Sequence, residues 1–281
     1  MSARELIRRT FIVIAVPLLA VTLSGQTATP QKPATQEKPK PFEPSVGQQG
    51  KDVVWVPTSQ ALVEKMLDLA KVTPQDYVID LGSGDGRTVI TAAKRGARAM
   101  GVEYDPNMVE LSLRNAKQAG VSDKVTFVKA DLFETDFSKA TVVTMFLLPS
   151  INLKLRPKIL DMKPGTRVVS NTFTMEDWEA DETAHITDGC SNWCTALLWI
   201  VPAKVNGTWQ SQRGDLTLTQ QFQKVIGTLG ANPISDGKLH GDEITFVAGG
   251  ARYTGHVNGN SIQGTVSGGS SNGSSWSATR R

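Results

Sequence analysis

The chain has 281 residues, of which 40% are hydrophobic and 20% are charged, and its formal net charge at pH 7 is +3. This composition is typical of globular proteins, and it excludes a collagen-like repeat, wholesale disorder and a protein with many membrane spans. The chain has no dense stripe of Lys and Arg interleaved with aromatic residues, so we expect no nucleic-acid partner. Three His and two Cys, without suitable spacing, predict no metal site.

The first 28 residues have the pattern of an export signal. Arg4, Arg8 and Arg9 precede the apolar run 11–23, which is shorter than the roughly 20 apolar residues of a membrane-spanning helix. Small residues follow, and we expect cleavage within residues 22–28. The two adjacent arginines also partly match a twin-arginine signal. We therefore expect an exported protein, periplasmic or extracellular; an uncleaved anchor that keeps the chain near a membrane is the alternative.

Residues 29–50 are rich in Pro, Lys, Gln and Thr, and they contain almost no apolar side chains. Such a segment cannot bury enough surface to offset the entropy that ordering costs. We therefore predict a disordered linker that precedes a folded domain over residues 51–204.

Within residues 51–204, short apolar runs alternate with amphipathic stretches. This alternation predicts a doubly wound, Rossmann-like α/β sheet that is mainly parallel. A pair of late strands would form a hairpin and bring the sheet to seven strands. The predicted strands are 77–81, 99–103, 125–128, 141–148, 167–170, 182–187 and 195–202, and the predicted helices are one that ends near Lys71, then 87–94, 106–119 and 151–162.

Residues 205–281 consist of short β-like runs separated by turns that contain glycine. This pattern predicts a small all-β meander or barrel domain. No cluster of titratable residues stands out there, so we expect a structural role, with binding of a small apolar ligand or presentation of an acceptor as alternatives. The predicted strands contain Trp209 or cover 216–221, 222–229, 238–247, 252–257, 261–266 and 274–280.

The segment 78–87, VIDLGSGDGR, places a glycine-rich turn between a buried strand and a helix. Glycines there permit a tight turn and the close approach of a ligand. The next strand ends in Glu103, where an acid can bind both hydroxyls of a ribose. The third strand is followed by Asp131, Leu132 and Phe133, which bring an adenine-binding carboxylate and a ring to the same edge of the sheet. Together these strand ends predict an adenosine site.

The details of the turn distinguish between adenosine ligands. Dinucleotide sites favour Gly-x-Gly-x-x-Gly, but here Gly86 comes one residue early and Asp85 would repel a phosphate. Asp80, just before the turn, suits a ligand ammonium group. S-adenosylmethionine carries adenosine at one end and an amino acid at the other, so it is the expected cofactor. A dinucleotide-dependent oxidoreductase is disfavoured.

Over roughly residues 54–202, these motifs resemble those of the class I, seven-β-strand S-adenosylmethionine-dependent methyltransferases. The pattern is most similar to the mitochondrial-type protein-lysine N-methyltransferases, which modify membrane proteins such as the ATP synthase c-subunit and the adenine nucleotide translocase, and to their small bacterial relatives. The resemblance rests on Trp55-Val56-Pro57-Thr58, on DLGSGDGR at 80–87, and on Ala140-Thr141-Val142-Val143 before Leu147-Leu148-Pro149.

The resemblance implies a methyltransferase whose acceptor is a protein lysine. It implies that the segment 56–58 closes over the cofactor, and that the end of the fourth strand borders the acceptor. Acceptor-side candidates are Thr144, Phe146 and Pro149. The cofactor-binding candidates are Val56, Pro57, Thr58, Asp80, Gly82, Ser83, Gly84, Asp85, Gly86, Glu103, Asp131, Leu132 and Phe133.

Methyl transfer from a sulfonium needs no metal, and the protein chiefly aligns the nucleophile, the methyl group and the sulfur. A lysine acceptor must also lose a proton, which a desolvated channel favours. Aromatic rings suit a channel for methylammonium, and Phe146, Phe133 and Trp55 are the candidates.

Two alternatives stay open. Cys190 and Cys194 either form a disulfide across a hairpin turn or remain free thiols. Because S-adenosylmethionine is made in the cytoplasm, an exported chain could instead be a non-catalytic protein that binds an adenosine ligand or another partner through a degenerate methyltransferase fold.

Overall fold

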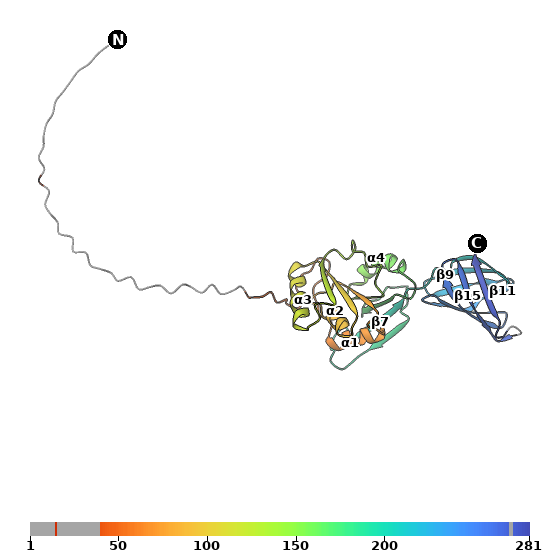
Figure 1. Ribbon diagram of the computed structural model, residues 1–281, viewed down its shortest axis with the longest axis horizontal. Coiled ribbons are helices and arrows are strands. Elements are labelled where there is room, and N and C mark those ends of the chain that lie inside the picture. The colour runs from red at the N-terminus through yellow and green to blue at the C-terminus, as the bar shows by residue number, and fades with distance from the viewer. Residues whose placement is uncertain (1–14, 16–39, 270–271) are drawn as a thin grey trace, which may run out of the picture. The chain divides into compact units, whose positions relative to one another are not determined.

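The computed structural model describes Ala15 and residues 40–269 and 272–281 (Figure 1). The predicted export signal therefore lies outside the described residues except for Ala15, and so do residues 29–39 of the predicted linker. Residues Phe42–Arg281 form one compact unit that contains two sheets. No helix among the described residues is long and apolar enough to cross a bilayer.

The strands of the first sheet are β1 Tyr77–Leu81, β2 Arg98–Glu103, β3 Val125–Lys129, β4 Val142–Met145, β5 Arg167–Asn171, β6 Glu182–His185 and β7 Thr195–Ile200. Their order in the sheet is β3-β2-β1-β4-β5-β7-β6. The strands β1 to β5 run parallel, and β7 lies antiparallel to both β5 and β6. The predicted doubly wound, seven-strand sheet is thus confirmed. Its strand order reverses beside β1, the place where such sheets bind ligands.

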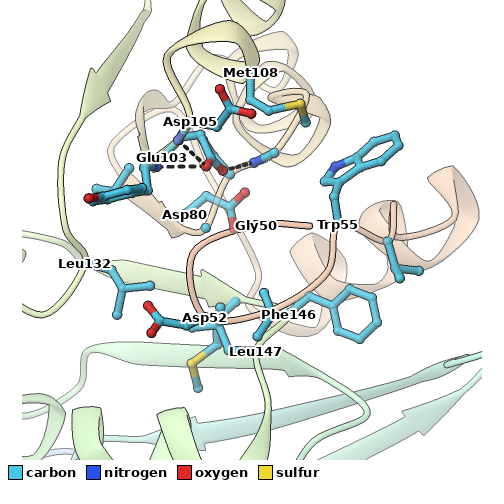
Figure 2. Close-up of a pocket in the computed structure, with 18 of the residues that line it drawn as sticks. Gly50, Asp52, Trp55, Asp80, Glu103, Asp105, Met108, Leu132, Phe146 and Leu147 are labelled. Atoms are coloured by element: carbon cyan, nitrogen blue, oxygen red, sulfur yellow. Dashed lines mark hydrogen bonds between the residues drawn. The ribbon is translucent and has the colours of Figure 1, made fainter. Parts of the chain in front are cut away.

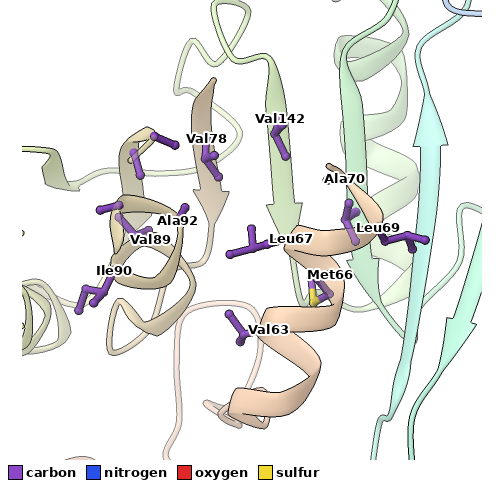
Figure 3. Packing of buried hydrophobic residues seen from close by; sticks show 14 of the residues in the cluster. Val63, Met66, Leu67, Leu69, Ala70, Val78, Val89, Ile90, Ala92 and Val142 are labelled. Carbon is purple, nitrogen blue, oxygen red and sulfur yellow. The ribbon is translucent and has the colours of Figure 1, made fainter. Parts of the chain in front are cut away.

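Four helices cover this sheet: α1 Gln60–Leu69, α2 Arg87–Lys94, α3 Pro106–Gln118 and α4 Pro149–Leu160. The first begins where the Ser59 hydroxyl accepts from the backbone of Leu62, and α3 begins where Asp105 accepts from Asn107. Their apolar stripes bury against the sheet. Figure 3 shows Leu67 of α1 and Val89 of α2 in one core layer with strand residues.

The opposite face of the sheet is covered by α4. Ile151, Leu155 and Ile159, at helical spacing, bury against it. The same core contains Trp178 and Trp199, and the Trp199 indole donates to the carbonyl of Trp178 at 2.7 Å. Because helices cover both faces of the sheet, the carboxyl ends of its strands are the part that remains accessible to a ligand.

The second sheet is a closed barrel, which confirms the predicted small β domain. Eight strands pair in antiparallel fashion, and β10 pairs with β9 as well as β12, which closes the barrel; β11 adds a short pairing to β10. Buried Trp209, Phe246, Tyr253 and Trp276 fill its interior. The strands are β8 Gly207–Ser211, β9 Gly214–Gln221, β10 Lys224–Leu229, β11 Asn232–Pro233, β12 Ser235–His240, β13 Glu243–Ala248, β14 Ala251–Asn258, β15 Ser261–Ser267 and β16 Ser275–Arg280.

Two predicted strands differ most from the observed ones. The run 238–247 is divided between β12 and β13, because His240 pairs with Glu243 across a two-residue turn in which Gly241 has φ +64°. The run 141–148 stops at Met145, and its last residues turn toward α4.

The barrel contacts the first sheet's domain through the turn between β9 and β10. The ring of Phe222 stacks on that of Trp178 with centroids 5.7 Å apart. Beside it, the Gln223 amide donates to the carbonyl of Glu179 at 2.8 Å, and Lys224 forms an ion pair with the Glu179 carboxylate.

Candidate active site

A cavity of about 450 Å³ opens at the carboxyl ends of β1, β2 and β4 (Figure 2). This volume lies in the range that proteins use for small-molecule ligands. The structure brings most of the predicted residues into its wall. Those that line it are Val56, Pro57, Thr58, Asp80, Gly82, Ser83, Gly84, Asp85, Glu103, Asp131, Leu132 and Phe146.

Four predicted residues do not line the cavity. Gly86 starts α2 with φ +80°, and a Cβ there would lie 2.7 Å from the Phe127 ring, so this glycine serves packing. Pro149 is the first residue of α4, and Phe133 packs with the core on the far face. Thr144 is fully buried and donates to Asp80 at 2.6 Å, so it positions that carboxyl and does not face an acceptor.

The glycine turn after β1 forms the floor beside Asp80. Gly82 and Gly84 have φ of +76° and +55°, a region that favours glycine. A Cβ on Gly84 would lie 2.7 Å from Trp55 Nε1, so the indole packs directly on the turn. The amide of Gly84 donates to Glu103 at 2.9 Å, which ties the turn to the end of β2.

Asp80 is a buried carboxyl in the middle of the cavity wall. Burial raises its pKa to about 7, the carboxylates of Glu103 and Asp85 add to that rise, and the hydrogen bond from Thr144 opposes it. No cationic side chain of the described residues forms an ion pair with Asp80. A buried, unpaired carboxyl of this kind favours a ligand that brings its own positive charge.

The acids predicted for ribose and adenine have different surroundings. One carboxylate oxygen of Glu103 accepts from the amides of Tyr104 and Asp105 at 2.8 and 3.0 Å, which fixes its orientation. Asp131 forms an ion pair with Lys51, and the hydrogen bond from Lys51 lowers the pKa of Asp131 below its usual range. Lys51 also lies 4.9 Å from the centre of the Tyr104 ring.

Residues 47–55 form a short hairpin that covers one side of the cavity. The amide of Gly47 donates to Trp55 at 2.9 Å, that of Trp55 donates to Gln48 at 2.8 Å, and Gly50 bonds to Val53 across the turn. Figure 2 shows this loop crossing the cavity between Gly50 and Trp55. The predicted linker 29–50 is therefore wrong at its end. Backbone pairing, which an apolar count does not register, orders this stretch.

Aromatic side chains line another part of the wall. The rings of Phe146 and Phe173 lie 5.8 Å apart and nearly parallel, and Trp193 is 5.9 Å from Phe146. Trp193 belongs to a loop closed by a disulfide between Cys190 and Cys194, which decides between the two predicted states of these cysteines. Of the predicted channel residues, Phe146 and Trp55 line the cavity and Phe133 does not.

Phe173, Trp193 and the hairpin residues 48–54 also line the cavity, and the sequence did not predict them as parts of its wall. One signal was present for Trp193, because it stands between two closely spaced cysteines. Phe173 had no comparable local signal. Tyr104 and Asp105 were also missed, although they directly follow the predicted ribose acid.

The residues present fit S-adenosylmethionine. Asp80 offers an unpaired carboxyl to an ammonium, and the buried hydroxyl of Ser83 has no hydrogen-bond partner among the described residues. The charged residues of the wall are six acids and two bases, which suits a cationic ligand. They are Asp52, Asp80, Asp85, Glu103, Asp105 and Asp131, with Lys51 and Arg87. In the part of the chain described, no group of three or more His, Cys, Asp or Glu is placed to hold a metal ion.

Comparisons with known proteins agree with this geometry. The family model of the ANTKMT methyltransferase domain matches residues 80–182. A protein-lysine N-methyltransferase of Saccharolobus islandicus (strain REY15A) is 44% identical over 152 residues, which are 53% of this chain and 94% of that protein. The adenine nucleotide translocase lysine N-methyltransferase of Mus musculus is 37% identical over 129 residues; the match covers 45% of this chain but only 56% of the mouse protein.

Among solved structures, a crystal structure described as an RNA methyltransferase from Salinibacter ruber, in complex with S-adenosylhomocysteine, superposes with a TM-score of 0.50. It is 47% identical and covers 53% of this chain and 96% of that one. The matched part of the chain thus holds a cofactor site of the kind that binds S-adenosyl compounds.

Proposed function

This chain belongs to the class I S-adenosylmethionine-dependent methyltransferases, in the family of the protein-lysine N-methyltransferases, and we propose that its acceptor is the side-chain amine of a protein lysine. The observation that carries the proposal is the acidic and aromatic wall of the cavity. Six carboxylates and two bases line it, together with the rings of Phe146, Phe173 and Trp193. Such a wall attracts a cationic side chain to the cavity.

The cofactor, when bound, supplies an activated methyl group on a sulfonium, whose sulfur is a good leaving group. This chain's residues hold and orient it. Asp80 would bind the ammonium of its amino-acid end, Glu103 would accept from the ribose hydroxyls, and Asp131 would lie on the adenine side. Thr144 keeps the Asp80 carboxyl in place through its 2.6 Å hydrogen bond. The hairpin 47–55 covers one side of the site, which limits the access of water from that side.

A lysine acceptor must reach the methyl group as a neutral amine. The carboxylates attract the ammonium to the mouth of the cavity, desolvation there lowers its pKa, and it releases its proton to solvent water before the neutral amine reaches the methyl group. No His lines the cavity among the described residues. Alignment and desolvation are therefore what lowers the activation barrier here. Precise positioning alone can lower it by about 7–11 kcal/mol.

RNA is the second candidate acceptor, because the Salinibacter ruber structure that is 47% identical is described as an RNA methyltransferase. RNA binding draws most of its affinity from phosphates that meet Lys and Arg. Here one of the two bases in the wall, Lys51, pairs with Asp131, and the other, Arg87, pairs with Asp85. The charge of the wall therefore favours lysine over RNA.

The test is a competition between acceptors for the full-length protein. It is incubated with methyl-labelled S-adenosylmethionine and either poly-L-lysine, poly-L-lysine with acetylated amines, or total RNA, and the products are identified by mass spectrometry. We expect Nε-methyl-lysine with poly-L-lysine alone. An Asp80→Asn variant is the matched control for cofactor-dependent transfer. Methylation of RNA without methylation of lysine would overturn the proposal.

A further inference from the structure

The mouth of the cavity carries exposed apolar side chains. Among the residues that the structure describes, seven large hydrophobic side chains are strongly exposed, and four of them line this cavity. These four are Val54, Tyr104, Leu148 and Trp193. Exposed apolar groups gathered around one opening mark a place where a partner is bound.

Trp193 is the one of the four that is held by an unusual backbone. It is 44% exposed and has φ +53°, a conformation that a bulky side chain rarely adopts. The disulfide between Cys190 and Cys194 closes its loop, which lies between β6 and β7. A strained residue in a cross-linked loop at a cavity mouth indicates that its position serves the site.

The ring that Trp193 meets belongs to the cavity wall. Phe146 lies between Trp193 and Phe173, with centroid distances of 5.9 and 5.8 Å. Thr172, just before Phe173, also has a positive φ of 58°. In Figure 2, Phe146 lies across the cavity from Glu103 and Asp105. The ring of Phe146, beside which the other two rings lie, thus stands apart from the residue assigned to the ribose.

We propose that the rings of Phe146, Phe173 and Trp193 form the subsite for the acceptor's ammonium group, and that Trp193 is its specificity-determining residue. The inference rests on the proposed lysine acceptor. Ring faces attract a cation, most strongly those of Trp, and the attraction grows as the site is desolvated. The Cys190–Cys194 disulfide positions Trp193, so reduction weakens acceptor binding without changing cofactor binding.

A binding comparison tests the charge preference directly. The full-length protein is saturated with S-adenosylhomocysteine and titrated with Nα-acetyl-Nε-trimethyllysine methylamide or with the neutral analogue in which carbon replaces the ammonium nitrogen. We expect the cation to bind about tenfold more tightly than the neutral analogue. Equal binding of the two, or no detectable binding of the cation, overturns the subsite. This measurement needs no methyl transfer, so its outcome is separate from that of the proposed function.

Variants then assign the effect to Trp193. Trp193→Ala should remove the preference and raise the KM for poly-L-lysine about tenfold with little change in kcat. Trp193→Phe should restore part of the preference. The control is Leu113→Ala, which truncates another exposed apolar side chain, on α3. An unchanged KM in Trp193→Ala overturns the role of Trp193, whereas lysine methylation itself would still stand.

The positioning role of the disulfide is tested with the Cys190→Ser, Cys194→Ser double variant and with the wild type treated with a phosphine reductant. Both should lose the preference for the cation to the same extent as Trp193→Ala. The affinity for S-adenosylhomocysteine should stay within about twofold, because the ring that Trp193 meets, Phe146, is assigned to the acceptor and not to the cofactor. Retention of the full preference after reduction would overturn the positioning role of the disulfide.

Discussion

Asp76 and Asp80 are buried carboxyls near the two ends of β1, and their surroundings differ completely. Asp76 accepts from the Thr73 backbone at 2.8 Å and from Thr141 at 2.7 Å, and it pairs with Arg167. Burial alone would raise its pKa, but these hydrogen bonds bring the pKa below its usual range. Asp80 has a hydrogen bond from Thr144 and no cationic partner among the described residues, and its pKa rises to about 7.

The difference separates the part of the sheet that stabilises the fold from the part that binds. At the amino end of β1, groups of the protein itself compensate the charge of Asp76. Its ion pair and hydrogen bonds therefore stabilise the fold without a ligand. At the carboxyl end, the compensating charge is left to a ligand, so burying Asp80 costs stability until the ligand arrives. The ionised carboxylate of Asp80 thus favours cofactor binding but disfavours folding of the unliganded chain. The carboxylate of Asp76 favours folding and plays no part in cofactor binding.

The strongest test of this contrast is Asp80→Asn. We expect the affinity for S-adenosylmethionine to fall about 100-fold or more, because the ligand ammonium would be buried without a counter-charge. The amide keeps the shape and can still accept from Thr144. Isothermal titration measures the affinity, and thermal unfolding of the unliganded variant should show equal or greater stability. An unchanged affinity would remove Asp80 from the cofactor site.

The reciprocal variant, Asp76→Asn, should damage stability and spare binding. Loss of the charge leaves Arg167 without its partner and is expected to cost about 3 kcal/mol of unfolding free energy, measured by urea titration. Asp68→Asn is the matched control, because its carboxylate is 63% exposed and pairs with Arg95 at the surface. That change should cost less than about 1 kcal/mol. Equal losses in the two variants would contradict the assignment of Asp76.

Much of the sheet could be predicted from sequence because its signals are local. The bounds of β1 were predicted correctly, since an apolar run there ends at a glycine turn. Helix α4 was predicted to begin at Ile151, whereas it begins at Pro149, a residue that suits the first turn of a helix. Asp80, Glu103 and Asp131 could be placed together because parallel strands end at one edge.

The remaining wall of the cavity is built by contacts that no local pattern encodes. Trp193 and Phe173 reach Phe146 from loops after other strands, and positive φ at Trp193 and Thr172 contradicts the preference of those residue types. Residues 47–50 of the hairpin were predicted as linker because the order of the hairpin comes from backbone pairing and from the Lys51–Asp131 ion pair. Composition alone does not report either interaction.

A smaller, graded effect follows from pH. The ligand ammonium binds the ionised form of Asp80, whose pKa is about 7 in the unliganded protein. Affinity for S-adenosylhomocysteine should therefore be constant above that pH and fall about tenfold per pH unit below it, as titration between pH 5.5 and 8.5 would show. Asp80→Asn should flatten this profile and Asp76→Asn should not. A sloping profile in Asp80→Asn would assign the proton to another group.

Unfolding of the unliganded protein should depend on the same two carboxyls with opposite signs. The folded-state pKa of Asp80 lies above its unfolded value, so protonation favours the folded state; its contribution is full below about pH 4 and is lost as pH rises toward 7. The folded-state pKa of Asp76 is lowered, so its contribution is full above about pH 4 and is lost as pH falls. Relative to wild type, Asp80→Asn should therefore gain stability as pH rises from 4 to 7. Over the same interval the loss of unfolding free energy in Asp76→Asn should stay nearly constant, and it should shrink only at lower pH. Plots of the variant-minus-wild-type unfolding free energy against pH therefore distinguish the binding carboxyl, Asp80, from the structural one, Asp76.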